Sequence, residues 1–268
     1  MSNRLSPLLT VMVNAAQKAG RALRRDFGEV ENLQILKKGP ADFVTKADTK
    51  AEKIIVEELQ KVRPAYGFVL EEGGVVEGSD ISNKWIIDPL DGTTNFLHGI
   101  PHFAVSVALE RDKRIEAAVV YNPITDDLYY AERGQGAFFR DSRLRVSGRS
   151  NIAESIFATG VPFLGRDGHD EFIEELRVVM THSAGIRRFG AASLDLAFVA
   201  AGRYDGYWER NISSWDMAAG LLLVKEAGGI VSDFSGRDRM METGGVIATN
   251  ASLDQDFRKL LKTAAKTS

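Results

Sequence analysis

The sequence predicts a mixed protein that is α+β in its first half and α/β in its second. Residues 103 to 146 contain the strand-like segments FAVSVALE, IEAAVVYN, LYYAE and GAFFR, which are separated by short turns, a pattern typical of an antiparallel sheet. After Ser147, strand-like and helical patterns alternate. We therefore expect an N-terminal α+β half at residues 1–147 and a C-terminal α/β half at residues 148–268.

Composition limits the classes of protein that the chain can belong to. Its 268 residues fit one large domain or two modest ones, and 44% hydrophobic residues suffice for a buried core. A net charge of -3 argues against a nucleic-acid binder with a large basic face. The chain has no cysteine, which excludes disulfides and thiolate metal sites and is consistent with a cytoplasmic location. The apolar run near the N-terminus is too short for a membrane span and lacks signal-peptide features, so we expect no membrane association.

Helical periodicity is the first pattern along the chain. It covers residues 5 to 27 and stops near Gly28. Glycine and proline then predict a loop over residues 37–42. A second helix is expected to begin near Asp48, whose side chain could cap it, and to end before Pro64.

Two short apolar runs follow, and each ends in acidic residues. The run FVL is followed by Glu71 and Glu72, and the run WII is followed by Asp88. If the two runs are neighbouring strands of one sheet, the carboxylates at their ends converge. The alternative is that the glutamate pair is solvated, as exposed glutamates usually are.

The second half alternates between strand-like segments and helical ones. SIFATG precedes a predicted helix at residues 169–182, and a helix at 191–201 precedes YDGYWE. A helix at 215–227 precedes GGIVSDF, and VIATN leads into a last helix.

The segment WIIDPLDGTTN carries the strongest chemical signal. Asp88 and Asp91 lie three residues apart, and Pro89 and Gly92 interrupt regular structure beside them, so a turn can direct both carboxylates at one point. Two close carboxylates repel each other unless a cation lies between them or one is protonated. Hard oxygen ligands suit Mg²⁺ or Mn²⁺. The alternative is an ordinary strand-to-helix turn capped by aspartate.

Residues Thr93 to Phe96 are predicted to form the first turn of a short helix. Free amides of Gly92 and Thr93 would then face the same point, and helix N-termini bind phosphate through such amides. Asp216, in SSWDMAAG, is either a favourable charge in the first turn of a helix or a metal ligand from the second half of the chain. Metal ligands beside anion-binding amides indicate a site for a phosphate monoester.

Two of these segments, WIIDPLDGTTNF and WDMAAGLLLVKEAGG, resemble the signature segments of the inositol monophosphatase family. VTKADTKAE, FVLEE and GAASLDLAFVAAGRYDGYWE are similar to its other recurrent blocks and occur in the same order. HFAVSVAL and EAGGIVSDF resemble the bacterial SuhB-type branch. One position departs from the pattern, because Leu70 stands where many relatives have Gly, Ser or Thr.

The resemblance implies a layered αβαβα sandwich, usually dimeric, with two or three Mg²⁺ ions. It assigns the first ion to Glu71, Asp88 and the Leu90 carbonyl, the second to Asp88, Asp91 and Asp216, and a weaker third to the vicinity of Glu71. Glu71 and Thr93 would orient the attacking water. The implied substrate site comprises Leu90, Asp91, Gly92, Thr93 and Asp216 on the phosphate side and Gly190, Ala191, Ala192 and Glu209 on the polyol side, with Lys37 nearby.

We therefore expect an Mg²⁺-dependent phosphatase that hydrolyses inositol 1-phosphate by metal-activated water and is inhibited by lithium. Related enzymes also use fructose 1,6-bisphosphate, 3′-phosphoadenosine 5′-phosphate, histidinol phosphate or NADP, so these substrates stay open. The rival hypothesis is a binding protein, because SuhB-type relatives suggest a partner in the transcription machinery.

Overall fold

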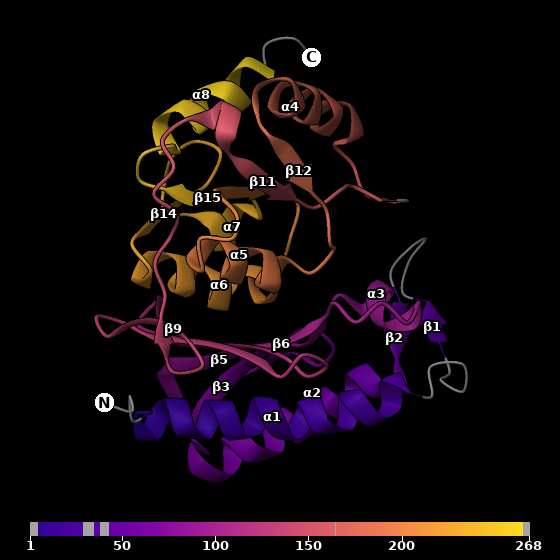
Figure 1. Cartoon of the computed structure of the whole chain (residues 1–268). Coiled ribbons are helices and arrows are strands. Elements are labelled where there is room, and N and C mark those ends of the chain that lie inside the picture. Colours follow the sequence, from indigo (N-terminus) through magenta and orange to yellow (C-terminus); the bar gives the residue numbers. More distant parts are fainter. Residues whose placement is uncertain (1–4, 29–34, 38–42, 164, 265–268) are drawn as a thin grey trace.

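The computed structural model describes residues 5–28, 35–37, 43–163 and 165–264. Its elements form five layers, in the order helices, sheet, helices, sheet, helices (Figure 1). The predicted αβαβα sandwich is thereby confirmed. The division into halves at residue 147 stays a prediction. The large sheet is built from residues 66–143 and the small sheet from residues 156–250, but one apolar core fills the space between them.

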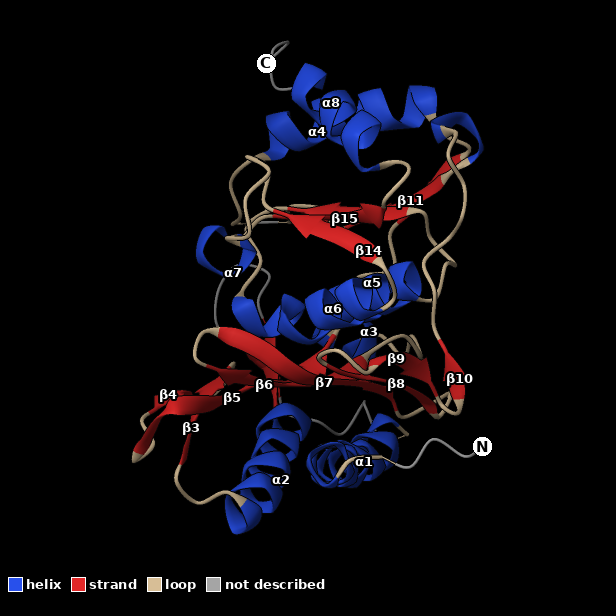
Figure 2. Ribbon diagram, turned by 90° about the vertical axis from the view of Figure 1, so that its left-hand side faces the viewer, coloured by secondary structure: helices blue, strands red, loops and turns tan. Residues whose placement is uncertain are grey.

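Two amphipathic helices, α1 (Pro7–Phe27) and α2 (Lys46–Val62), cover the outer face of the large sheet (Figure 2). The Ser6 hydroxyl caps α1 by accepting a hydrogen bond from the Leu9 amide at 3.1 Å, and α1 ends before Gly28 as expected. Helix α2 begins at Lys46, so Asp48 lies inside its first turn and the expectation of a capping Asp48 is wrong. The short strands β1 (Ile35–Lys37) and β2 (Phe43–Thr45) pair with each other, and residues 38–42 of the expected loop lie outside the described residues.

The large sheet has the strand order β10-β9-β8-β7-β6-β5-β3-β4. From β5 to β10 every neighbouring pair is antiparallel, which confirms the antiparallel sheet predicted from the short turns. In contrast, β3 pairs with β5 in parallel. The strands are β3 (Tyr66–Leu70), β4 (Gly74–Val76), β5 (Asp80–Asp91), β6 (Ala104–Arg111), β7 (Arg114–Asn122), β8 (Asp127–Glu132), β9 (Gly136–Phe139) and β10 (Ser142–Arg143).

The small sheet is mixed and has the order β12-β11-β13-β15-β14. Strand β11 runs parallel to both of its neighbours, whereas β15 runs antiparallel to β13 and β14. Its strands are β11 (Ile156–Thr159), β12 (Gly185–Arg187), β13 (Gly206–Glu209), β14 (Gly229–Ser232) and β15 (Val246–Asn250).

The central helices α5 (Ala192–Ala200) and α6 (Ser214–Glu226) lie between the two sheets (Figure 2). Most of their residues are buried because a sheet covers each side, which explains why these segments are apolar around most of the helix. A Cβ atom at Gly220 would lie 2.5 Å from Leu196, so glycine allows the two helices to approach closely.

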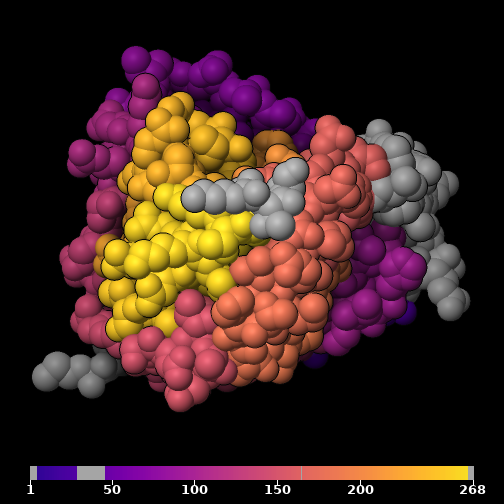
Figure 3. Space-filling view, turned by 90° about the horizontal axis from the view of Figure 1, so that it is seen from above, coloured from indigo at the N-terminus to yellow at the C-terminus, as the bar shows by residue number. Residues whose placement is uncertain are grey.

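Helices α4 (His169–His182) and α8 (Asp254–Ala264) cover the outer face of the small sheet, and Figure 3 shows them side by side on this end of the molecule. The short helices are α3 (Thr93–Leu97), η2 (Ile152–Glu154) and α7 (Met240–Thr243). Within the part of the chain that the structure describes, none of the helices combines the length and the apolar character that crossing a bilayer requires.

Candidate active site

Acidic side chains converge where β3 and β5 end. The two strands are parallel and Leu70 lies opposite Ile87, so Glu71 and Asp88 are neighbours at one edge of the sheet. Asp88, Asp91 and Asp216 each offer a carboxylate oxygen within 4.8 Å of the others. The structure therefore brings Asp216, from α6, to the two aspartates of β5.

A β-bulge in β5 makes this convergence possible. Asp88 and Asp91 lie within the strand, whereas the sequence suggested that they follow it. They are paired with Ser106 and Ala104 of β6, so β5 has one residue more than its partner between these two positions. In a regular strand, residues three apart point to opposite faces, and the extra residue returns both carboxylates to one face. Pro89 is tolerated at this bulge because no ladder hydrogen bond is needed there.

Burial and mutual repulsion perturb the ionisation of these carboxyls. Burial, with the negative charges of Glu71 and Asp91, raises the pKa of Asp88 well above its usual value. Burial and the charge of Asp91 do the same to the pKa of Asp216. Since a divalent cation would relieve this repulsion, the donor set fits a hard metal ion.

Asp91 is held by the start of α5. Its carboxylate accepts hydrogen bonds from the Ser193 hydroxyl at 2.5 Å, the Ser193 amide at 2.7 Å and the Ala192 amide at 3.2 Å. Burial raises the pKa of Asp91 to about 6, although the three hydrogen bonds act in the opposite direction. Ser193 thus orients a carboxylate.

A second acidic group combines Glu71 with Glu72 and Asp48, whose carboxylate oxygens lie within 4.8 Å of one another. Sequence reasoning missed Asp48. It is fully buried, and the Thr93 hydroxyl lies 3.3 Å from its Oδ2 and 3.0 Å from the Leu90 carbonyl oxygen. The only sequence signal for Asp48 was its position near the start of a predicted helix. An aspartate at that position is equally typical of an N-cap.

The turn after β5 leads into the short helix that the sequence predicted. Gly92 has φ +96°, a conformation that favours glycine, and it precedes α3. The first hydrogen bond of α3 joins the Phe96 amide to the Gly92 carbonyl at 3.0 Å, so the Gly92 and Thr93 amides precede the helical hydrogen-bond ladder.

These residues open into a pocket of about 210 Å³. Asp88 does not line this pocket. The Leu90 side chain packs in the core between the large sheet and its outer helices, so only the Leu90 carbonyl oxygen is left to bind a ligand or a metal ion. The expected residues that do line it are Glu71, Asp91, Gly92, Thr93, Gly190, Ala191, Ala192, Glu209 and Asp216. The side chain of Lys37, which was also expected near the site, lies outside the described part of the structure.

The far end of the pocket lies in the second half of the chain. Burial raises the pKa of Glu209 to about 7, partly offset by a hydrogen bond from the Tyr207 hydroxyl. Arg166, Arg188 and Asp195 also line this end, and of these Arg166 and Asp195 were missed from the sequence. Asp195 is buried, with no hydrogen-bond partner for its Oδ1 atom among the described residues. Carboxyl groups that can accept hydrogen bonds from hydroxyls, beside arginines that attract anions, suit a hydroxylated, anionic ligand.

Comparison with known proteins gives a consistent result. The model of the inositol monophosphatase family matches residues 4–266. An inositol-1-monophosphatase of Rhizobium meliloti is 58% identical over 257 residues, which cover 96% of this chain and 97% of the relative. A protein of Pseudomonas aeruginosa named Nus factor SuhB is 46% identical over 263 residues, which cover 97% of this chain and 96% of the relative. The crystal structure of the extragenic suppressor protein SuhB from Bartonella henselae superposes with a TM-score of 0.94 at 55% identity, covering 96% of this chain and 99% of that one.

Proposed function

We propose that this chain, which belongs to the inositol monophosphatase family, hydrolyses myo-inositol 1-phosphate to inositol and phosphate with Mg²⁺ as its metal. The observation that carries the proposal is the cluster of Asp88, Asp91 and Asp216, three buried or half-buried carboxylates that need a cation. Family members are metal-dependent phosphatases, and three relatives at 54–58% identity are named inositol-1-monophosphatase.

The metal ligands would come from both acidic groups. Asp88, Asp91 and Asp216 would hold one ion, and Glu71, Asp88 and the Leu90 carbonyl another, with a weaker third near Glu71; Mn²⁺ could replace Mg²⁺. When bound, the ions supply positive charge at the phosphate and lower the pKa of bound water.

The chain's own residues would position the reactants. The Thr93 hydroxyl, whose proton is directed at Asp48 and the Leu90 carbonyl, would accept a hydrogen bond from the attacking water. Glu71 would orient the same water from the end of β3. The Gly92 and Thr93 amides would hold the phosphate oxygens, because they precede the hydrogen-bond ladder of α3.

The polyol would lie against the segment from Gly190 to Ala192 and against Glu209. The carboxyl of Glu209 can accept a hydrogen bond from a ring hydroxyl, and the positive φ of Gly190, +80°, turns the chain beside the pocket. The family resemblance further supports a homodimer and inhibition by lithium, which would occupy the site of Asp88, Asp91 and Asp216.

Phosphate release from inositol 1-phosphate, measured with and without Mg²⁺, tests this function. The same assay with fructose 1,6-bisphosphate, 3′-phosphoadenosine 5′-phosphate, histidinol phosphate and NADP tests its substrate. We expect Mg²⁺-dependent release that is largest with the inositol ester. Turnover of another ester alone would keep the reaction and change the substrate, and no release from any ester would overturn the proposal.

A second candidate function is a partner role in transcription. It is supported by relatives at 42–46% identity that are named Nus factor SuhB. Capture of RNA polymerase or its elongation factors from lysate by the wild type and by Asp88→Asn would test it. Equal capture by both would separate the partner role from catalysis, and no capture by either would contradict it.

A further inference from the structure

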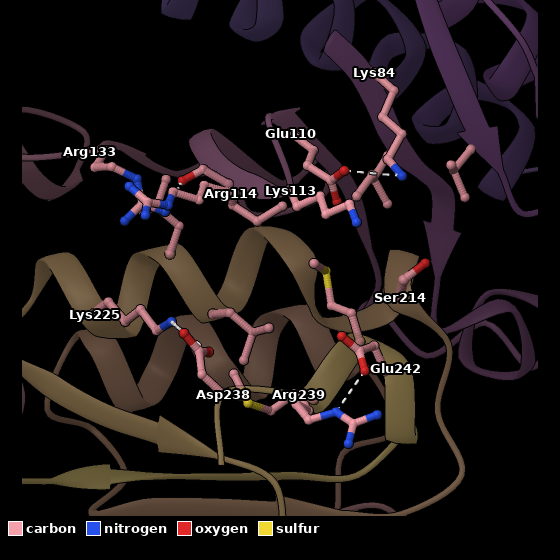
Figure 4. A pocket seen from close by; sticks show the side chains of 17 residues that line it. Lys84, Glu110, Lys113, Arg114, Arg133, Ser214, Lys225, Asp238, Arg239 and Glu242 are labelled. Atoms are coloured by element: carbon pink, nitrogen blue, oxygen red, sulfur yellow. Dashed lines mark hydrogen bonds and ion pairs between the residues drawn. The ribbon is translucent and has the colours of Figure 1, made fainter. Parts of the chain in front are cut away.

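The molecule has a second pocket that is larger than the one lined by the acidic residues. A pocket of about 510 Å³ lies between the large sheet and the central helix layer, and it shares no lining residue with the candidate active site. Figure 4 shows side chains from the sheet on one side of this pocket facing side chains of α6 and of the segment that leads into α7 on the other. We call it the basic pocket.

The basic pocket concentrates positive charge. Six basic side chains and three acidic ones line it, an excess of three positive charges, although the whole chain has a net charge of -3. The basic residues are Lys84, Lys113, Arg114, Arg133, Lys225 and Arg239. An accumulation of one sign of charge in a concave, partly apolar site attracts ligands of the opposite sign.

Ion pairs within the basic pocket neutralise only part of this charge. Lys84 pairs with Glu110 at 3.0 Å, Lys225 with Asp238 at 3.0 Å, and Arg239 with Glu242 at 2.7 Å. All three carboxylates that line the pocket are therefore engaged.

The remaining basic residues lie beside two strand ends: Lys113 precedes β7, Arg114 is its first residue, and Arg133 directly follows β8. Arg133 pairs with Glu116 at 3.0 Å, outside the lining, whereas Lys113 and Arg114 have no ion pair among the described residues. These last two are the cations available to a ligand.

The position of Lys113 supports a role for its charge. Asp112 and Lys113 form the tight turn between β6 and β7, with φ values of +47° and +63°. Glycine or asparagine usually occupies such a turn because most side chains are strained there. Lysine is present instead, at the rim of the basic pocket.

The floor of the basic pocket is apolar. It is formed by buried Ile86, Leu221, Leu222 and Met240, with Met241 partly buried beside them. Methionine side chains adapt to flat or irregular ligands, and a volume of this size can enclose a nucleotide-sized molecule. The apolar floor favours the organic part of a ligand, and the basic residues favour its negative charge. The basic pocket therefore suits an organic anion better than an inorganic one.

We propose that the basic pocket is a second ligand site, for a small organic polyphosphate whose phosphates contact Lys113 and Arg114 and whose organic part covers the apolar floor. Two elements link it to the acidic residues: β5 carries Ile86 in the pocket and Asp88 at the cluster, and α6 carries Ser214 in the pocket and Asp216 at the cluster. The site is separate from the one used for hydrolysis and does not depend on the proposed substrate.

The test uses ATP as the probe and calorimetry in metal-free, low-salt buffer, in which the acidic cluster repels anions. We expect saturable binding of one ATP per chain and weaker binding of inorganic tripolyphosphate. The double variant Lys113→Gln/Arg114→Gln should bind ATP at least about tenfold more weakly, because it loses two charge-assisted contacts. Its turnover of inositol phosphate and its unfolding temperature should be those of the wild type.

The matched control is Lys53→Gln/Lys262→Gln, which removes two exposed lysines outside the basic pocket. It should bind ATP like the wild type. Absence of saturable ATP binding, or equal binding by the Lys113/Arg114 variant and the wild type, would overturn the site. An equal loss of ATP affinity in the control would show that only net charge matters and would contradict a specific site. Tripolyphosphate binding as tight as ATP binding would overturn the assignment of an organic ligand.

Discussion

The Ser193 hydroxyl donates a hydrogen bond of 2.5 Å to the carboxylate of Asp91, although the two residues are 102 positions apart in the sequence. The bond joins β5 in the large sheet to the start of α5 in the central helix layer. It fixes the orientation of one carboxylate of the acidic cluster, so the geometry of that cluster depends on how the central helix layer packs against the large sheet.

Replacing Ser193 by alanine should weaken metal binding more than it lowers the maximal rate. Loss of a group that orients a metal ligand typically costs about 10- to 100-fold in metal affinity. The Mg²⁺ concentration for half-maximal activity should rise accordingly, with kcat largely restored at saturation. The exposed Ser150→Ala serves as control. An unchanged Mg²⁺ dependence would show that this hydrogen bond does not serve metal binding.

Asp88→Asn should remove most of the activity and leave the fold intact. The variant deletes a negative charge from the centre of the cluster, and loss of one such electrostatic group lowers kcat by roughly 100- to 1,000-fold. The metal-free variant should unfold at the same temperature as the wild type or higher, because a buried repulsion disappears. Asp141→Asn, at an exposed position, is the matched control. Near-normal turnover at saturating Mg²⁺ would contradict the assignment.

Thr93→Val should lower kcat by roughly 100-fold, as expected when a group that positions a proton-transferring water is lost. Thr93→Ser keeps the hydroxyl and should retain most activity. Because Thr93 contacts Asp48, the effects of Thr93→Val and Asp48→Asn should not add in the double variant. Strict additivity of the two effects would mean that the residues act independently.

The stability of the metal-free protein should fall as pH rises from acid toward neutral. Asp91 has an ordinary value of 3.8 and a folded pKa of about 6, so between these values the folded state binds more protons than the unfolded state. Folding stability due to this group is therefore present below pH 3.8 and is lost as pH rises to about 6.

Urea unfolding of the wild type and Asp91→Asn in chelator, at several pH values, isolates this contribution. Asp91→Asn should gain stability relative to the wild type as pH rises through that range. A pH-independent difference between the two proteins would contradict the raised pKa of Asp91.

Lithium should inhibit turnover at millimolar concentration. Li⁺ is a small, hard cation that oxygen ligands accept, but it carries half the charge of Mg²⁺ and compensates three carboxylates less well. Initial rates with LiCl, compared with NaCl at equal ionic strength, measure the effect. Equal rates in the two salts would argue against lithium binding at Asp88, Asp91 and Asp216.

The sequence by itself determined most elements of this protein, whereas its layers were implied by the resemblance to a known family. Apolar periodicity predicted α1 and α4, and short turns between strand-like segments predicted the antiparallel strands from β6 to β9. These features depend on local hydrophobic patterns, which are readable along the chain. The spacing of Asp88 and Asp91 and the segment around Asp216 likewise predicted a metal cluster.

Tertiary structure alone decided which polar groups meet. The bulge that turns Asp88 and Asp91 to one face follows from the pairing of β5 with β6. The approach of Asp48 to Thr93 joins residues 45 positions apart, and the basic pocket combines a strand turn with a helix more than 100 residues later. Such contacts depend on how the layers pack, and no local pattern records the distance between side chains that packing brings together.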